Sequence, residues 1–572
     1  MRAADAIVLI AYFTTMIAVG AGYSRHMKSA EMYFAGGKQL PWWIGGVSFV
    51  MSYVSALSIV VYAGLGYEYG AVALTLYWTT VPASILTTWL LARRWRRAGI
   101  ITPTEFLERR FSSLIRQLFV WSGVPLKIID ESLKIVAIGI FVSAGLGLSA
   151  GTAMLVVGLT ILIYAVLGGL WAVVVTDFVQ FVLVTGAILL LLPLTFHAAG
   201  GWHHVIASVP KQFFAPVHPP YGWTYVGAFL VLSTLSLAGN WSLIQKFYSA
   251  RSDSEAVRVG WLATFIFLVL PPIWITTGML ARGYIPSIGD PQSIYARLSS
   301  ALLPAGMLGL IVAALFAATM SVLSSGYNVM SAVLTLDVYR RLFRPAADQR
   351  ELVLVGRILT ALLAVIVLVL ALTITHFHWT IFDTMVAAFG FFLPPTVLPM
   401  LAGLLSRSLS STGALAGFLA GIAIGIVFLL YRWFAHPLNA GSFQALSIVV
   451  PAVFTAAVLV IAAVFFPARG AEAERADRFF HGLTQSSDAA AALSLNPARI
   501  AGYVIAIMGT VLILVSLATL ITGQRFNAQS MIMGAIFAAI GLCFIASSWM
   551  RKTQPLAQGP KTKTGALHHH GA

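Results

Sequence analysis

The chain has 572 residues, of which 59% are hydrophobic and only 9% are charged, and its mean hydropathy is +0.89. Soluble domains carry about 25% charged residues, so this composition excludes an ordinary globular protein. The formal net charge is +16, but the basic residues fall at the ends of apolar segments, which indicates membrane topology rather than a nucleic-acid-binding surface. The single cysteine, Cys543, allows no intramolecular disulfide.

Apolar runs of about 20 residues recur along the whole chain, and each is long enough to cross a bilayer as a helix. The fold class predicted is therefore an all-α polytopic membrane protein with about 15 spans. The predicted spans are approximately 4–21, 42–66, 71–92, 117–146, 151–170, 172–197, 223–246, 257–281, 304–337, 353–375, 380–404, 411–431, 446–467, 499–521 and 528–549.

Basic residues gather in alternate loops between these spans, which predicts an outside N-terminus and a cytoplasmic C-terminus. One of the predicted cytoplasmic loops contains Lys246, Arg251 and Arg258. The longest segment between spans, 468–498, is predicted to be a connector with a short surface helix, and 551–572 a disordered cytoplasmic tail.

Two predicted spans contain polar and small residues at mid-membrane depth. The second span reads IGGVSFVMSYVSALS, with paired glycines and four serines, and the seventh reads LSTLSLAGNWSLIQ. Such residues either permit close helix packing or mark spans that unwind at the membrane midplane to bind an ion or solute. Their corresponding positions in two halves of the chain favour functional breaks.

The ninth span places Ser321, Ser324 and Ser325 on one helical face, because they follow the i, i+3, i+4 spacing. Hydroxyl oxygens are hard ligands that suit a small hard cation such as sodium. Asp177 lies in the sixth span, where a carboxylate is expected to have a functional cation partner. Alternatively, Asp177 caps the N-terminus of that helix.

A second polar cluster occupies the fourth span, in PLKIIDESLKI. Its members are spaced so that Lys127 faces Glu131 and Asp130 faces Lys134 at i, i+4. One interpretation is a structural lattice of salt bridges. The other is a proton site or a site for the headgroup of a solute, with Asp130 or Glu131 as the titrating group.

Four motifs occur in order along the chain: YFAGGKQLPWWIGGVSFVMSYVSA, TPTEFLERRF, GGLWAVVVTDFVQ and TLDVYRR. Together they resemble the sodium:solute symporter family over roughly residues 1–470, including the bacterial sodium/galactose, sodium/proline and sialic acid carriers. The resemblance implies a LeuT-type fold, in which two inverted five-helix repeats surround a midplane site. It also implies one extra N-terminal helix and about four extra C-terminal helices.

The resemblance implies a sodium site formed by the carbonyls of Ala318, Met51 and Val54 and by hydroxyls at positions 321 and 322. Ser321 supplies the first hydroxyl, whereas Val322 supplies none. Some relatives, such as the sialic acid carriers, have a second sodium site. By position, that site would here use the side chains of Asp177, Ser321, Ser324 and Ser325.

The resemblance also places the solute pocket. Positions that hold sugar-binding amide and carboxylate side chains in the galactose carrier are here Tyr53, Ser58 and Tyr77, and its gating tyrosine corresponds to Ser236. A smaller or partly apolar solute such as an organic acid is therefore expected as much as a sugar. The predicted pocket residues are Tyr53, Ser58, Tyr77, Thr80, Ser236, Asn240 and Phe389.

The leading hypothesis is a sodium-coupled importer of a small organic solute that works by alternating access in the inner membrane of a bacterium. The alternatives are a proton-coupled or sodium-independent carrier and a transporter-like membrane sensor. No nucleotide-binding loop or catalytic metal motif is found, so an enzyme is not expected. Neither a cofactor nor an obligatory protein partner is expected, and the environment is the lipid bilayer.

The predicted organisation follows from the spans and the resemblance. It comprises an N-terminal helix and loop (1–41), a first repeat (42–200), a second repeat (222–405), peripheral helices (411–550) and the tail (551–572).

Overall fold

The computed structural model describes residues 3–24, 29–146, 148–167, 170–304, 306–374, 381–435, 440–485, 497–521 and 528–550. The named elements within these ranges are all helices. The predicted tail 551–572 and the paired glycines of the GGLWA sequence lie outside the described residues.

The helices of the first part of the chain follow the predicted spans, with short helices between them. They are α1 (Ala3–Ser24), α2 (Ala30–Ala35), η1 (Gly36–Lys38), α3 (Trp42–Met51), α4 (Ala56–Tyr69), α5 (Ala71–Trp78), α6 (Thr80–Arg97), α7 (Glu105–Arg110), α8 (Ser113–Leu146), α9 (Ala150–Leu167), α10 (Leu170–Ala198), α11 (Gly201–Ser208) and η2 (Lys211–Phe214).

The second part continues in the same way, and one segment, η4, is a π-helix. Its elements are α12 (Trp223–Gly239), α13 (Trp241–Tyr248), α14 (Asp253–Val269), α15 (Pro271–Tyr284), η3 (Pro291–Ser293), α16 (Ile294–Leu302), α17 (Met307–Val333), η4 (Leu334–Phe343), α18 (Gln349–Ile374), α19 (Ile381–Leu405), α20 (Ser411–Ala435), α21 (Ala440–Phe465), α22 (Ala471–Thr484), α23 (Pro497–Ile521) and α24 (Ala528–Met550).

Many of these helices can cross a membrane. Among the described residues, eight segments are long and apolar enough to span a bilayer, and two bent helix pairs bring the total to ten if each pair is one span. The remaining predicted spans correspond to four shorter apolar helices and to α8, which carries several charges. The protein is thus a helical multi-span membrane protein, and the total of about 15 spans stays a prediction.

Two spans are broken near their middle. Helices α3 and α4 meet at a bend of 59° across residues 52–55, and α12 and α13 meet at 51° across Asn240. The Asn240 side chain accepts a hydrogen bond from the backbone N–H of Ser242 at 3.0 Å and so caps α13. Both breaks lie in the polar segments that the sequence singles out.

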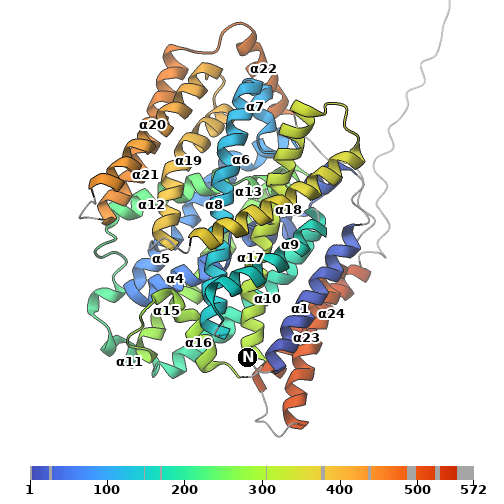
Figure 1. Cartoon of the computed structure of the whole chain (residues 1–572), viewed down its shortest axis with the longest axis vertical. Coiled ribbons are helices and arrows are strands. Elements are labelled where there is room, and N and C mark those ends of the chain that lie inside the picture. Colours follow the sequence, from blue (N-terminus) through green and yellow to red (C-terminus); the bar gives the residue numbers. More distant parts are fainter. Residues whose placement is uncertain are drawn as a thin grey trace, which may run out of the picture.

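Helix α17 runs through the centre of the molecule, against α10, α8 and α18 (Figure 1). Nearly every side chain along it is buried, its serine face included, because other helices pack around it. Helices α1, α23 and α24 stand together along one edge, and α7 and α22 lie at the opposite end of the molecule from α11 and α16 (Figure 1).

Candidate functional site

The Asp177 carboxylate lies at the centre of a buried hydroxyl cluster beside α17. Asp177 is well inside α10 and fully buried, so the alternative that it caps the N-terminus of that helix is wrong. Its two oxygens accept hydrogen bonds from the hydroxyls of Ser48 on α3 and Ser321 on α17. Three helices therefore meet at this one carboxylate.

The break between α3 and α4 adds backbone carbonyls to this cluster. Ser321 Oγ lies 2.9 Å from the Met51 carbonyl oxygen, at the last residue of α3. The Ala56 amide at the start of α4 donates to Thr319 Oγ1 at 3.2 Å, which fixes the second half-helix against α17. Val54 and Ala318 are buried on the two segments that meet here.

Position 322 points no oxygen into this region, because Val322 is buried and apolar. The side-chain oxygens next to the Met51 carbonyl come instead from Ser321 and, through it, from Asp177. The arrangement offers oxygen atoms of carbonyl, hydroxyl and carboxylate type, which are the ligands that a hard monovalent cation takes.

The two remaining serines of the α17 face do not contact Asp177. Ser324 Oγ donates to the Ser321 carbonyl of its own helix at 3.1 Å. Ser325 Oγ lies 3.0 Å from Ser52 Oγ at the α3 break and 3.5 Å from Lys246 Nζ. Of the predicted second-site hydroxyls, only that of Ser321 is therefore hydrogen-bonded to the carboxylate.

The position of Lys246 differs from the expectation that it belongs to a cytoplasmic loop. It lies on α13, the half-helix after the second break, and its side chain is fully buried. Counting basic residues near the ends of spans cannot separate a lysine that reaches solvent from one that faces the protein interior. Ser48, Ser52 and Lys246 are the cluster members that sequence reasoning did not identify as site residues.

The ionisable residues of α8 form the compact lattice expected from their spacing. Lys127 Nζ is 3.3 Å from Asp130 and 2.9 Å from Glu131, and Lys134 Nζ is 2.9 Å from each of the same two carboxylates. All four side chains are buried, and their two positive and two negative charges balance. Such mutual pairing offsets part of the cost of removing each charge from water.

A cavity opens between the two broken helices and the α8 lattice. All seven predicted pocket residues line it, as do Lys127, Asp130 and Lys134 of the lattice, whereas Glu131 does not. Most of the other lining side chains are apolar or aromatic: Leu57, Val61, Tyr62, Phe119, Leu126, Phe229, Leu232, Trp241, Met385, Leu393, Val397 and Met400. The cavity thus has an aromatic body and one charged wall.

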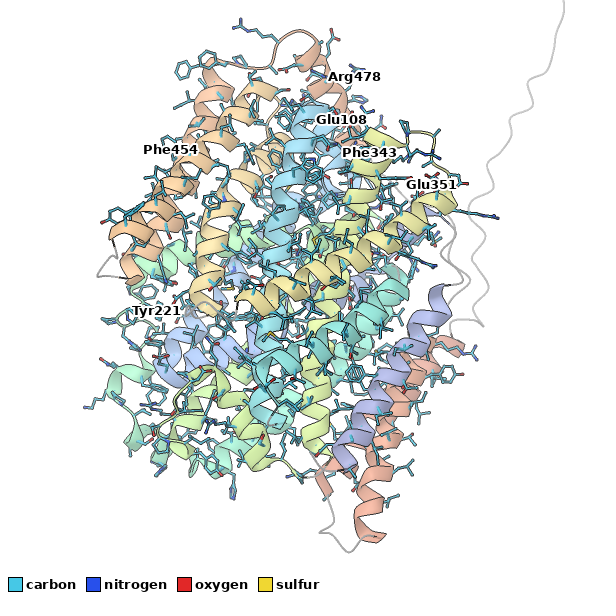
Figure 2. The ribbon with its side chains drawn as sticks, in the orientation of Figure 1. Glu108, Tyr221, Phe343, Glu351, Phe454 and Arg478 are labelled. Carbon is cyan, nitrogen blue, oxygen red and sulfur yellow. The ribbon has the colours of Figure 1, made fainter. Side chains whose placement is uncertain are left out.

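A separate polar network joins two of the sequence motifs at the end of α17. The Asp337 carboxylate in η4 is fully buried and accepts hydrogen bonds from Thr102, Thr104 and Arg116. Arg116 also pairs with Glu108 at 2.7 Å. Figure 2 shows Glu108 at the end of the molecule that carries Phe343 and Arg478. The motifs TPTEFLERRF and TLDVYRR therefore meet in space.

Comparisons with known proteins agree on the class of protein. The chain is 27% identical over 490 residues to the human sodium/glucose cotransporter 4, a match that covers 77% of this chain and 71% of that protein. It is 29% identical over 455 residues to the sodium/glucose cotransporter of Vibrio parahaemolyticus, covering 72% of this chain and 82% of the relative.

Solved structures show the same fold. A Na⁺-coupled sialic acid symporter in its substrate-bound outward-open state superposes with a TM-score of 0.71 at 20% identity, covering 82% of this chain and 99% of that one. A nucleobase-cation-symport-1 family transporter in a closed conformation superposes with a TM-score of 0.51 at 12% identity, covering 79% of this chain and 99% of that one.

The model of the sodium:solute symporter family matches residues 33–421, which is more than half of the chain. The chain therefore belongs to this family, as its motifs predicted. Its relatives are transporters and not enzymes, and sodium is their coupling ion. The protein performs sodium-coupled secondary transport of a small solute.

Proposed function

We propose that this sodium:solute symporter imports a partly apolar organic acid through the cavity between its two broken helices, by alternating access. One observation carries the proposal. Ser52, in the first break, lines the solute cavity, and its hydroxyl lies 3.0 Å from Ser325 in the cation cluster. Ser52 therefore belongs both to the solute cavity and to the cation cluster, the two sites that a symporter must couple.

The coupling sodium is assigned to the first of the two predicted sites. Its ligands are the carbonyls of Ala318, Met51 and Val54 and the hydroxyl of Ser321. The 2.9 Å approach of Ser321 Oγ to the Met51 carbonyl supports this assignment, because both oxygens then face the same small volume at the break. Unwound carbonyls at a broken helix are the usual cation ligands in transporters of this architecture.

The class of solute follows from the lining of the cavity. Aromatic side chains such as Tyr53, Tyr77 and Phe389 offer stacking surface. Lys127 and Lys134 line the opposite wall together with Asp130, and an ammonium group is a donor that can hydrogen-bond to a carboxylate. The human and Vibrio relatives are named as sugar cotransporters, whereas the wall of this cavity is lined by two lysines and one aspartate, an excess of positive charge that favours an acid over a neutral sugar.

The proposed architecture has inverted repeats at 42–200 and 222–405, each beginning with a broken helix, flanked by residues 1–41 and by peripheral helices over 411–550. The proposed location is the inner membrane of a bacterium, with the N-terminus outside. Helices α7 and α22, which each carry two arginines beside acidic residues, lie together at one end of the molecule, and this supports the orientation because loops rich in lysine and arginine face the cytoplasm (Figure 1).

The test is uptake into proteoliposomes under an inward sodium gradient, with potassium as the matched control. We expect sodium-dependent uptake of a short-chain aromatic or aliphatic carboxylate and none of glucose. Ser321→Ala should abolish the sodium dependence, whereas Ser331→Ala should not. Ser331 is a buried serine of the same helix whose hydroxyl, within the described part of the chain, bonds the Asn328 carbonyl of its own helix. Equal uptake in potassium, or uptake of glucose instead of an acid, would contradict the proposal.

Sodium binding can be measured before the solute is identified. A ligand that binds only the folded protein at 100 times its dissociation constant raises stability by about 2.7 kcal/mol. A sodium titration of thermal stability should therefore show a shift that Ser321→Ala removes and Ser331→Ala retains.

A further inference from the structure

The buried ammonium group of Lys246 has no direct carboxylate partner. The Lys246 side chain is fully buried, and its Nζ donates a hydrogen bond to Ser325 Oγ at 3.5 Å. No carboxylate oxygen of the described residues lies within 4 Å of Nζ. The two lysines of the α8 lattice are different, because each contacts two carboxylates at 2.9–3.3 Å. A buried charge without such pairing is costly, so its position requires an explanation.

The Asp177 carboxylate, which belongs to the same hydroxyl cluster, likewise has no ion-pair partner among the described residues. Asp177 is fully buried, its oxygens accept only the hydroxyls of Ser48 and Ser321, and no described cationic group lies within 4 Å of it. One positive and one negative charge thus occupy the same interior, separated by hydroxyl groups.

Three serines lie between these two charges. Lys246 donates to Ser325, whose hydroxyl lies 3.0 Å from that of Ser52. Ser52 Oγ in turn lies 2.7 Å from the Ser48 carbonyl, and the Ser48 hydroxyl donates to Asp177. The Lys246 ammonium group therefore lies at one side of the predicted second cation site, next to the Ser325 hydroxyl.

We propose that Lys246 is a tethered cation that fills this second site and keeps a second sodium ion out. The inference rests on the proposed assignment of the coupling sodium to the carbonyls at the α3 break. With Lys246 present, the Asp177 charge is already balanced, and a further ion would place two cations beside one carboxylate. Lys246 thereby sets the number of sodium ions that the protein binds.

The place of Lys246 in the fold adds a mechanical consequence. It is carried by α13, which follows the break at Asn240, so any change in the bend between α12 and α13 moves the ammonium relative to α17. A free sodium ion can leave such a site during the cycle, whereas a lysine cannot. The tethered charge stays with the protein in both directions of transport.

The experiment counts bound ²²Na⁺ per chain by equilibrium dialysis of the full-length protein in detergent. We expect one ion for the wild type and two for Lys246→Met, with the apparent Hill coefficient rising from one toward two. Lys246→Arg, which keeps the positive charge, should retain the wild-type count. The extra ion should disappear in the double variant Lys246→Met/Asp177→Asn, because the carboxylate that holds it is gone.

Three results would overturn the proposal: two ions in the wild type, an unchanged count in Lys246→Met, or an extra ion that survives Asp177→Asn. If Lys246→Met is recovered folded only in sodium, that result supports the proposal, since sodium then replaces the ammonium. If Lys246→Met is recovered folded in neither sodium nor potassium, whereas Lys246→Met/Asp177→Asn is recovered in both, the proposal is contradicted. A wild-type count of zero refutes the proposed coupling site alone, because the gain of one ion in Lys246→Met is still measured.

Discussion

Replacing Asp337 by Asn tests the network that joins two sequence motifs at the end of α17. The substitution keeps the shape of the side chain and removes its charge, which leaves Arg116 facing a neutral amide. Removing one partner of a buried ion pair costs about 3–5 kcal/mol. Arg116 keeps Glu108 at 2.7 Å, so we expect the lower end of this range, about 3 kcal/mol.

The measurement is the free energy of unfolding in mixed detergent micelles, followed by tryptophan fluorescence. Glu108→Gln is the matched control, since Glu108 contacts the same arginine from a partly exposed position. Partly exposed ion pairs contribute about 1 kcal/mol or less. If Asp337→Asn were no more destabilising than Glu108→Gln, burial would not be the source of the network's strength and the reasoning would fail.

Three further predictions concern single positions. Val322→Thr places a hydroxyl beside the proposed sodium site. In potassium, we expect this variant to be less stable than the wild type. In the sodium titration of thermal stability, we expect its midpoint at a lower sodium concentration than that of the wild type, and an unchanged midpoint would place the ion elsewhere. Gly326→Ala should destabilise the protein by about 1–3 kcal/mol, because the added Cβ would lie 2.2 Å from Glu131 Oε1 and displace that carboxylate from the α8 lattice; a melting curve equal to wild type would refute this. Partial burial raises the pKa of Glu108, but hydrogen bonds from two arginines outweigh it and hold the pKa below its ordinary value. The stability that Glu108 adds is therefore present at neutral pH and lost as the pH falls below about 4, so wild type and Glu108→Gln should converge in acid melts and differ at pH 7.

The sequence was most informative where local chemistry conflicts with a membrane environment. Asn240 is a polar residue in an apolar span and follows Gly239, and the structure breaks the span there. The same logic located the serine face around Ser321. Such signals are local, because a polar group in hydrocarbon needs a partner wherever the rest of the chain lies.

Contacts between distant segments were not accessible in this way. The four serines around the first break are equivalent in composition, and only the rotation of the chain at α3 brings Ser48 to Asp177 and Ser52 to Ser325. Asp337 meets Thr102 across a separation of 235 residues, although each lies in a motif that the sequence identified. Motif spacing along the chain contains no information about which motifs touch.

The arrangement of both polar clusters along one helix suggests how ion binding at the first cluster affects the Asp337 network at the other end of that helix. Ser321 and Asp337 lie about 24 Å apart along α17 and its continuation η4, and both are fully buried. Helix α17 is enclosed on all sides, whereas α3 and α13 end at breaks and contribute Met51 and Lys246 to the cluster. A cation shifts a conformational equilibrium only by binding one state better than the other. Any movement of either half-helix away from α17 removes oxygen ligands or the ammonium from the cluster. We infer that sodium favours the conformation in which both breaks are seated against α17, and that this rigid helix conveys the change to the Asp337 network.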